Sequence, residues 1–251
     1  MRKKRDKGKY IDGKYIWEDN KYYIGEFKNH LTNGKGIKYY SNVNILYDGE
    51  FVNGKFEGKG KYIYKNGKYY IGEYKNSLRN GKGILYYSNG SIIYDGEFVN
   101  DEIEGKGKYI YEDGEYYIGE FENGLRNGKG IEYYSNGNIK YDGEFVDEEY
   151  EGKGKEIYED GEYYIGEYKN GLRDGQGIEY YSNGNIKYEG KFVNDEYEGK
   201  GKYIWEKGEY YIGQFKNNLR NGKGILYYPN GNIKYDGEYI NDKAEGKGKC
   251  I

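Results

Sequence analysis

The stretch "YYIGEFENGLRNGKG", residues 116–130, decides the fold, because close copies of it recur along the chain of 251 residues. It places a tyrosine, a glycine and a phenylalanine at every second position, and a glycine-rich segment with charges follows. Side chains at every second position of a β-strand point to the same face, so Tyr117, Gly119 and Phe121 are predicted to share one face. Ile118 and Glu120 would then lie on the opposite face.

The aromatic–x–Gly–x–aromatic triplet occurs ten times, at intervals that alternate between 24 and 23 residues. The units therefore come in pairs with a period of 47 residues, and the two members of a pair differ in sequence. A fixed period of this length indicates a repeat protein in which each unit packs on its neighbours. We expect the triplets to form one aromatic face, either as the protein's own core or as part of a binding groove: Tyr23, Phe27, Tyr47, Phe51, Tyr70, Tyr74, Tyr94, Phe98, Tyr117, Phe121, Tyr141, Phe145, Tyr164, Tyr168, Tyr188, Phe192, Tyr211, Phe215, Tyr235 and Tyr239.

Each unit is predicted to be a β-hairpin, since glycine interrupts the sequence too often for an amphipathic helix. Asn123–Gly124 and Asn127–Gly128 supply residues that tolerate positive φ at the tip, and the segment 128–130 is expected to open the return strand. The segments "SNGN" (135–138) and "EDGE" (159–162) would turn the chain at the opposite edge.

The predicted fold class is all-β: an elongated single-layer antiparallel sheet of tandem β-hairpins. An aromatic ring on one strand can lie over a glycine of the neighbouring strand, where no Cβ blocks it. Each ring buries roughly 150–250 Å², and its hydroxyl is expected to stay in solvent. Two strands per unit at about 4.8 Å each predict a length on the order of 100 Å. Of doubled tyrosines such as Tyr86–Tyr87 and Tyr180–Tyr181, one ring of each pair is expected to be exposed.

The unit "YIGEYKNGLRDGQGIEYYSNG" (164–184) runs from the triplet through a basic tip to Gly-x-Gly, a strand and Asn-Gly. In this order of residues it resembles the MORN repeat (membrane occupation and recognition nexus), and the resemblance covers residues 12–251. The family favours tryptophan at the second aromatic position, where this chain has Phe27 or Tyr74 and their equivalents. It often has histidine before the Gly-x-Gly, where this chain has Asn33 and its equivalents, or glutamate.

The predicted domain organisation is a basic N-terminal tail over residues 1–9, followed over residues 10–251 by about ten MORN-type hairpin repeats with a preceding half repeat. The resemblance implies a non-enzymatic scaffold or adaptor that binds partner proteins, in the cytoplasm at the cytoskeleton, the cell cortex or a membrane. One expected partner is an amphipathic helix in the groove. Two alternatives stay open: peripheral binding to acidic phospholipid membranes, and the role of a bacterial antitoxin-like protein.

The charge of the chain is unevenly distributed. The net charge is −3, but residues 1–9 carry six basic residues and one acidic residue, a net of +5 that leaves −8 for the rest. An acidic body opposes nucleic acid, so no nucleic-acid partner is expected. A basic residue at an anionic surface contributes about 1 kcal/mol, so the tail is the candidate contact for acidic phospholipids. The residues concerned are Arg2, Lys3, Lys4, Arg5, Lys7 and Lys9.

The sequence offers no pattern typical of catalysis or metal binding. His30 is the only histidine and Cys250 the only cysteine, so thiolates cannot build a zinc site. The segment "GLRNGKG" (124–130) has three rather than four residues between its glycines and lacks the Ser or Thr of a phosphate loop. We expect no catalytic residue, no cofactor and no metal. No apolar stretch follows the basic start, and no run of about 18 apolar residues occurs, so neither a secretory signal nor a membrane span is predicted.

The hairpin tips carry charges of alternating sign. First-type tips are basic, as at Arg79 and Arg173, and second-type tips are acidic, as at Asp101 and Asp195. Opposite charges on neighbouring tips either stabilise the packing, by little per pair at a surface, or set the register of a partner. An unpaired strand at the end of a sheet invites further pairing, so homodimerisation through an open sheet end is also expected.

Overall fold

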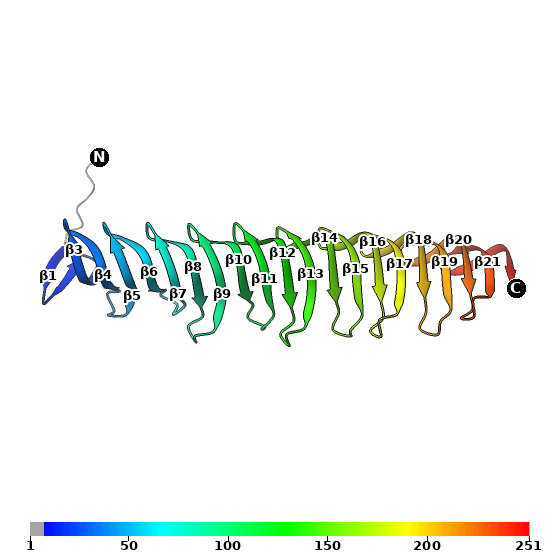
Figure 1. Cartoon of the computed structure of the whole chain (residues 1–251), viewed down its shortest axis with the longest axis horizontal. Coiled ribbons are helices and arrows are strands. Elements are labelled where there is room, and N and C mark those ends of the chain that lie inside the picture. The colour runs from blue at the N-terminus through cyan, green and yellow to red at the C-terminus, as the bar shows by residue number, and fades with distance from the viewer. Residues whose placement is uncertain (1–7, 251) are drawn as a thin grey trace, which may run out of the picture. The chain divides into compact units, whose positions relative to one another are not determined.

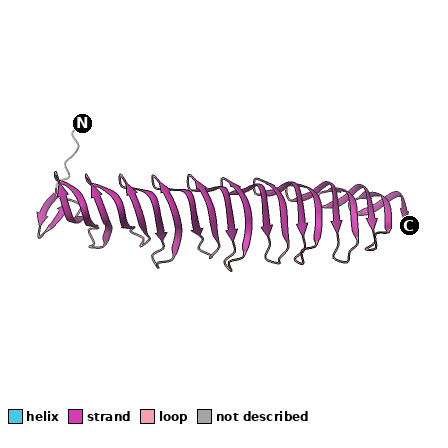
Figure 2. Ribbon diagram, in the orientation of Figure 1, coloured by secondary structure: helices cyan, strands magenta, loops and turns pink. Residues whose placement is uncertain are grey.

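The computed structural model describes residues 8–250, with side chains up to residue 245. These residues form 22 strands and the turns that join them (Figure 2). Within the described part of the chain, no helix is long and apolar enough to cross a membrane. The predicted fold class, an antiparallel sheet of tandem β-hairpins, is confirmed.

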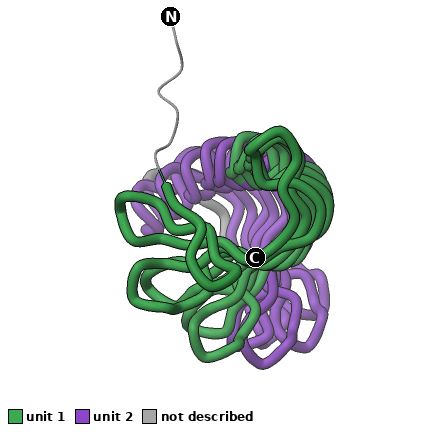
Figure 3. Tube along the Cα trace, turned by 90° about the vertical axis from the view of Figure 1, so that its left-hand side faces the viewer, with its two compact units in different colours: residues 1–125 green, residues 126–251 purple. Residues whose placement is uncertain are grey.

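The chain divides into two compact units, residues 1–125 and 126–251 (Figure 3). The first unit contains eleven strands in its described residues, and each pairs antiparallel with the next one along the chain (Figure 1). They are β1 (Gly8–Ile11), β2 (Lys14–Trp17), β3 (Tyr22–Lys28), β4 (Leu31–Tyr39), β5 (Ile45–Val52), β6 (Lys55–Ile63), β7 (Tyr69–Lys75), β8 (Leu78–Tyr86), β9 (Ile92–Val99), β10 (Glu102–Ile110) and β11 (Tyr116–Glu122).

The second unit repeats this arrangement, and its first strand begins one residue before the boundary. Here too, each strand pairs antiparallel with its successor. The strands are β12 (Leu125–Tyr133), β13 (Ile139–Val146), β14 (Glu149–Ile157), β15 (Tyr163–Lys169), β16 (Leu172–Tyr180), β17 (Ile186–Val193), β18 (Glu196–Ile204), β19 (Tyr210–Lys216), β20 (Leu219–Tyr227), β21 (Ile233–Ile240) and β22 (Lys243–Cys250).

Glycines of neighbouring strands pair with one another across the sheet. In the second unit, for example, Gly177 pairs with Gly190, and Gly190 pairs with Gly201. The Tyr188 ring lies where Cβ atoms on Gly190 and Gly201 would be, so any side chain at either position would clash with it. The structure confirms that a ring lies over a glycine of the neighbouring strand, and it adds the glycine two residues further along the ring's own strand.

The aromatic rings of the triplets make a zigzag of edge-on contacts along each unit. The centroid of the Tyr188 ring lies 5.2 Å from that of Phe192 in its own hairpin and 5.3 Å from that of Phe215 in the next hairpin. Both phenylalanine rings are nearly perpendicular to the tyrosine ring. This T-shaped arrangement is favourable for aromatic pairs. In the first unit, Tyr47 contacts Phe51 and Tyr74 in the same way. The core is therefore a continuous line of rings, and each hairpin supplies part of its neighbour's packing.

The hydroxyls of the core tyrosines are inside the protein, so the expectation that they stay in solvent is wrong. The Tyr188 side chain is fully buried, and its hydroxyl donates to the Lys191 carbonyl at 3.1 Å. Tyr164 and Tyr141 make the same bond to the carbonyl three residues further along, at 3.2 Å each. A buried hydroxyl needs a hydrogen-bond acceptor, and here the carbonyl three residues further along the strand is that acceptor.

The turns at the two edges of the sheet follow the sequence signals in part. Asn123 and Gly124 have φ values of 53° and 82° and form a tip, as predicted. The opposite edge turns at 135–138 and 159–162, where Tyr134 N–H donates to Asn138 and Tyr158 N–H to Glu162. The return strand, however, begins at Leu125 rather than at 128–130. Gly128, with φ of 97°, lies within that strand, and the strand continues past it.

One buried hydroxyl has no partner. Tyr74 is 5% exposed, and its hydroxyl makes no hydrogen bond to any described residue. The equivalent Tyr168 donates to the Glu156 carboxylate at 3.1 Å, and position 62, equivalent to 156, is a tyrosine. Burial raises the pKa of Glu156, and the bond from Tyr168 offsets part of that effect.

Replacing the unpaired hydroxyl should therefore stabilise the protein. We expect Tyr74→Phe to raise the free energy of unfolding by about 1 kcal/mol, because it removes a buried polar group that lacks a partner. Tyr168→Phe is expected to lower it by a similar amount, because Glu156 then loses one of its two tyrosine donors, Tyr158 being the other. Urea titrations of both variants test this difference. Equal effects of the two substitutions would contradict it.

Candidate functional site

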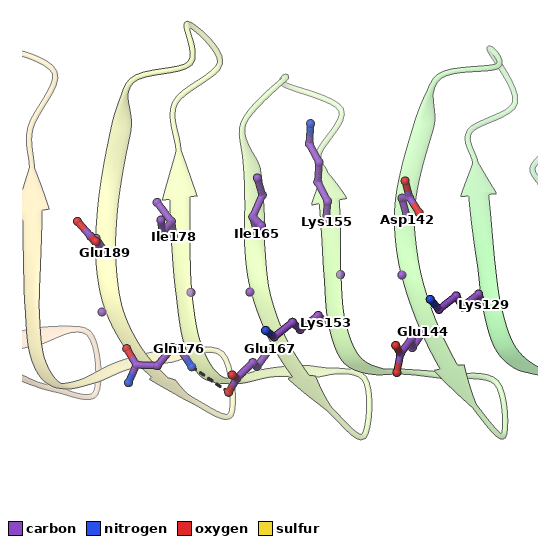
Figure 4. Close-up of a pocket in the computed structure, with 15 residues that line it drawn as sticks. Lys129, Asp142, Glu144, Lys153, Lys155, Ile165, Glu167, Gln176, Ile178 and Glu189 are labelled. Atoms are coloured by element: carbon purple, nitrogen blue, oxygen red, sulfur yellow. Dashed lines mark hydrogen bonds between the residues drawn. The ribbon is translucent and has the colours of Figure 1, made fainter.

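Strands β12–β17 form a groove of about 810 Å³ on the face opposite the aromatic core, and all of its lining residues belong to the second unit. Figure 4 shows two rows of side chains that flank the glycine positions of these strands. The groove follows from strand alternation, because Ile165 lies between the buried Tyr164 and Gly166 and must point to the other face. Its lining residues are Lys129, Asp142, Gly143, Glu144, Lys153, Gly154, Lys155, Ile165, Gly166, Glu167, Gln176, Gly177, Ile178, Glu189 and Gly190.

One row of the groove alternates between apolar and charged pairs. Ile165 of β15 lies directly across from Ile178 of β16, and Asp142 of β13 lies across from Lys155 of β14. Ile165 keeps 43% of its surface exposed, although cross-strand apolar pairs normally favour burial. The other row is polar, and in it Gln176 N–H donates to the Glu167 carboxylate at 3.2 Å (Figure 4).

An isoleucine pair with one exposed member and one half-buried member recurs. In the first unit Ile71 pairs with Ile84, and in the second Ile212 pairs with Ile225. Ile71 and Ile212 are 44% and 45% exposed. Each isoleucine pair lies within one first-type hairpin. The second-type hairpin between two such hairpins has a pair of an acidic residue and a lysine at the same place, such as Glu189–Lys202. The groove face therefore carries one apolar pair in every four strands, and charges of both signs lie between successive pairs.

A cluster of charged and polar side chains is buried beside the aromatic core of the second unit. Glu179 is 6% exposed and accepts from the Tyr197 hydroxyl at 2.7 Å. Its carboxylate also pairs with Lys187 at 3.0 Å and with Arg173 at 3.4 Å. Burial alone would lower the pKa of Lys187, but hydrogen bonds to Glu162 and Glu179 outweigh it and raise the pKa above its usual value. The carboxylate is compensated on several sides, as a buried charge requires.

The same place in the first unit is apolar. Leu85, Ile93 and Ile103 occupy the positions equivalent to Glu179, Lys187 and Tyr197, 94 residues earlier. Ile93 is 4% exposed, so this version is also buried. The same place in the repeat is therefore filled by a charged cluster in the second unit and by apolar side chains in the first.

The tip charges of neighbouring hairpins make ion pairs with one another. The Arg173 guanidinium pairs with the Asp195 carboxylate at 3.1 Å and donates to the Asp195 carbonyl at 2.9 Å. Arg126 and Glu148 are arranged in the same way, at 2.7 Å and 2.8 Å. These contacts support the packing interpretation of the alternating tip charges.

The predicted aromatic face lies in the core, away from the groove. Eighteen of its residues are buried, and Phe27 and Tyr235 are half-buried. The expectation for the doubled tyrosines is wrong at Tyr180–Tyr181. Tyr181 is buried and donates to the Ile204 carbonyl at 2.8 Å, while Tyr180 stacks on Tyr163 at 4.4 Å.

The tail residues predicted to contact lipid lie mostly outside the described residues, and lipid binding stays a prediction. Arg2, Lys3, Lys4, Arg5 and Lys7 precede the described part of the chain, and Lys9 is exposed on β1. Sequence reasoning missed the groove isoleucines as candidate site residues. The signal was present, because each isoleucine stands between a core tyrosine and a ladder glycine, where alternation turns it to the other face.

Among residues 8–245, no group of three or more His, Cys, Asp or Glu side chains is placed to hold a metal ion. The MORN repeat family model matches ten segments of the chain, and the segments begin at the first tyrosine of each triplet. No curated protein shows a significant match. The matched segments are residues 23–42, 47–69, 70–92, 94–116, 117–139, 141–163, 164–186, 188–210, 211–233 and 235–251.

Proposed function

The chain belongs to the MORN repeat family, and on that premise we propose that it is a non-enzymatic scaffold that binds partner proteins at the cytoskeleton or cell cortex. The binding surface is the groove of strands β12–β17. Repeat arrays present extended surfaces of this kind, because each repeat adds the same side chains to the same face.

The pair Ile165–Ile178, in which Ile165 is exposed and Ile178 is half-buried, carries the proposal. An apolar pair on an otherwise charged face is a place where a partner's apolar side chain gains burial. Asp142, Lys155 and Glu167 surround the pair, so a partner with charges of both signs would match the rim. The backbone of the floor is already paired between strands, so the partner contributes side chains rather than a further strand.

The partner with the best fit is a protein segment such as an amphipathic helix, whose apolar side chain covers the isoleucines. The core tyrosines are buried and leave no ring surface for a partner. A groove of about 810 Å³ accommodates a few side chains. Binding at several grooves along one array would add avidity.

The test uses the full chain as bait to capture a partner, which is then purified and titrated against variants. We expect the double variant Ile165→Glu, Ile178→Glu to bind the partner at least about tenfold more weakly, because two charges replace the apolar anchor. Val43→Glu is the matched control, since Val43 is 69% exposed in the turn between β4 and β5 and is not among the residues that line the groove. It should leave the affinity unchanged.

Two results would count against the proposal. Failure of the intact chain to capture any protein would remove the scaffold function. An unchanged affinity of the double variant, with circular dichroism showing intact β-structure, would remove the groove as the binding surface.

A further inference from the structure

We propose that the groove face of the second unit binds a carboxylate side chain of the partner at Lys191 of β17 and at Gly199 and Lys200 of β18. We call these three residues the carboxylate site. The inference rests on the proposed scaffold function and deepens it, because it assigns an acidic residue to the partner. The site adjoins the groove, whose lining includes Glu189 and Gly190 of the same β17.

The polar row of the groove face pairs a lysine with a glutamate at most boundaries between hairpins. In the second unit, Lys129 lies across from Glu144, and Lys153 lies across from Glu167. The first unit has the same row, in the pairs Lys35–Glu50, Lys59–Glu73, Lys82–Glu97 and Lys106–Glu120. Opposite charges therefore face each other along the row, which favours cross-strand pairing.

This balance is lost at β17 and β18. Gln176 lies across from Lys191, and Lys200 lies across from Gln214. At both boundaries a lysine therefore faces a neutral amide, and no glutamate of the row balances it. Both lysine side chains are exposed.

Two acidic residues near these lysines leave the site positive. Glu189 lies across from Lys202 on the groove face. Glu198 lies across from Lys191, but its carboxylate accepts from the Asn217 N–H of the next hairpin at 3.3 Å. The described side chains show no ion pair between Glu198 and Lys191. Relative to a glutamate at the same place, Lys191 makes this part of the face more positive by two charges, which favours an acidic partner group.

In other second-type hairpins, the glutamate of the row lies over a glycine of the next strand. A Cβ built on Gly152 of β14 would be 2.8 Å from the Glu144 carboxylate. Gly152 has φ of 62° and belongs to a β-bulge, because the register shifts between Gly143 and Glu144. The first unit repeats this contact at 2.7 Å and 2.9 Å, in the pairs Gly58–Glu50 and Gly105–Glu97.

The backbone of such a bulge can hold a carboxylate. In the first-type hairpin β15–β16, the Gln176 N–H donates to the Glu167 carboxylate at 3.2 Å (Figure 4). Gln176 follows Gly175, which has positive φ, and Lys200 follows the positive-φ Gly199 in the same way. Backbone N–H groups beside residues with positive φ form anion-binding concavities. We therefore expect the Lys200 N–H to donate to a bound carboxylate.

At Gly199 the row supplies no carboxylate. Four of the five second-type hairpins have a glutamate where this hairpin has Lys191, and no atom lies within 4 Å of a Cβ built on Gly199. A glutamate or aspartate of the partner can therefore take the place that Glu144 takes over Gly152. It would accept from the bulge and pair with Lys191 and Lys200, and such charge-assisted hydrogen bonds are stronger than neutral ones.

The carboxylate site is within reach of the isoleucine pair that carries the proposed function. Strands β17 and β18 lie two strands beyond β15 and β16, which corresponds to about 9.6 Å at about 4.8 Å per strand. Along the strand, the polar row lies two residues from the row of Ile165 and Ile178, or about 6.6 Å. The diagonal is about 12 Å, the rise of about eight residues of an α-helix. One partner helix can therefore supply both the apolar anchor and the acidic residue.

The test is a titration of the full chain with a labelled hexaglutamate peptide at low ionic strength, followed by fluorescence anisotropy. Hexaglutamine is the neutral control peptide. A hexapeptide that alternates phosphoserine and serine carries a similar charge on phosphates rather than carboxylates. None of these probes depends on a captured partner, so failure of the peptide to bind would leave the scaffold function in place.

Three variants locate the binding. Lys191→Glu gives β17 the glutamate of the other second-type hairpins, a residue that the fold accepts at this place. Lys65→Glu is the matched control, because it makes the same change of charge at an exposed turn position of the first unit, where the equivalent residues are Glu112, Glu159 and Glu206. The double variant Lys191→Glu, Glu144→Lys keeps the net charge and moves the site to Gly152.

We expect hexaglutamate to bind the intact chain and Lys191→Glu to weaken the affinity by at least about tenfold. Lys65→Glu should leave the affinity unchanged, and the double variant should restore it. Absence of binding, equal losses in Lys191→Glu and Lys65→Glu, or a double variant that fails to bind would overturn the proposal. Tighter binding of the phosphoserine peptide than of hexaglutamate would overturn the assignment of a carboxylate.

Discussion

Substitution of Gly201 by alanine is expected to lower the free energy of unfolding by about 3 kcal/mol, the upper range for overpacking a core. An alanine Cβ at this position would lie 2.5 Å from the Tyr188 hydroxyl oxygen and 2.7 Å from a ring carbon. The ring cannot give way, because it is fully buried and held edge-on by Phe192 and Phe215. Chemical denaturation of the variant measures the loss.

Gly199→Ala, on the same strand, is the matched control for this prediction. Gly199 has φ of +67°, and no atom lies within 4 Å of a Cβ built there. The control should cost only the backbone strain of a side chain at positive φ, about 1 kcal/mol. A smaller loss of unfolding free energy for Gly201→Ala than for Gly199→Ala would mean that the Tyr188 ring moves to make room for the added Cβ. That result would contradict the tight packing of rings on paired glycines.

Replacement of Glu179 by leucine is expected to lower the free energy of unfolding by about 3 kcal/mol, because it removes the acceptor of a buried cluster. Lys187 and Arg173 would lose a counter-charge, and the Tyr197 hydroxyl would lose its acceptor. Thermal and urea unfolding of the variant, compared with the natural chain, measure the effect.

A triple variant tests the cause of that loss. Glu179→Leu combined with Lys187→Ile and Tyr197→Ile reproduces Leu85, Ile93 and Ile103 of the first unit. We expect it to recover at least about half of the lost stability, since apolar residues of suitable size can replace a buried ionic cluster at little cost. A triple variant less stable than the single one would mean that the cluster stabilises the protein in its own right.

The fold followed from the sequence because its determinants are local and repeated. The triplet Tyr188–x–Gly190–x–Phe192 fixes which face each side chain takes, and the ten copies fix the neighbours of each hairpin. The return strand begins at Leu125, earlier than predicted, and this error has a local reason. Asn-Gly at 127–128 looks like a turn, but Gly128 uses its positive φ inside a strand rather than at a tip.

The candidate binding surface was harder to predict from the sequence than the fold. The core tyrosines drew attention because they are abundant, yet Tyr188 is fully buried and offers nothing to a partner. A residue such as Ile165 is ordinary in sequence and becomes notable only when its exposure is known. The bond from Tyr197 to Glu179 joins positions 18 residues apart, and no single repeat reveals it.

The pairing of basic and acidic tips has a consequence for how such a chain can evolve. Arg173 of a first-type hairpin is bonded to Asp195 of the following second-type hairpin. Deletion of one hairpin would bring two hairpins of the same type together and leave an arginine without its acceptor. Gene duplication or loss in steps of 47 residues preserves every such contact. The pair of hairpins is therefore the unit whose copy number can change while each interface stays the same.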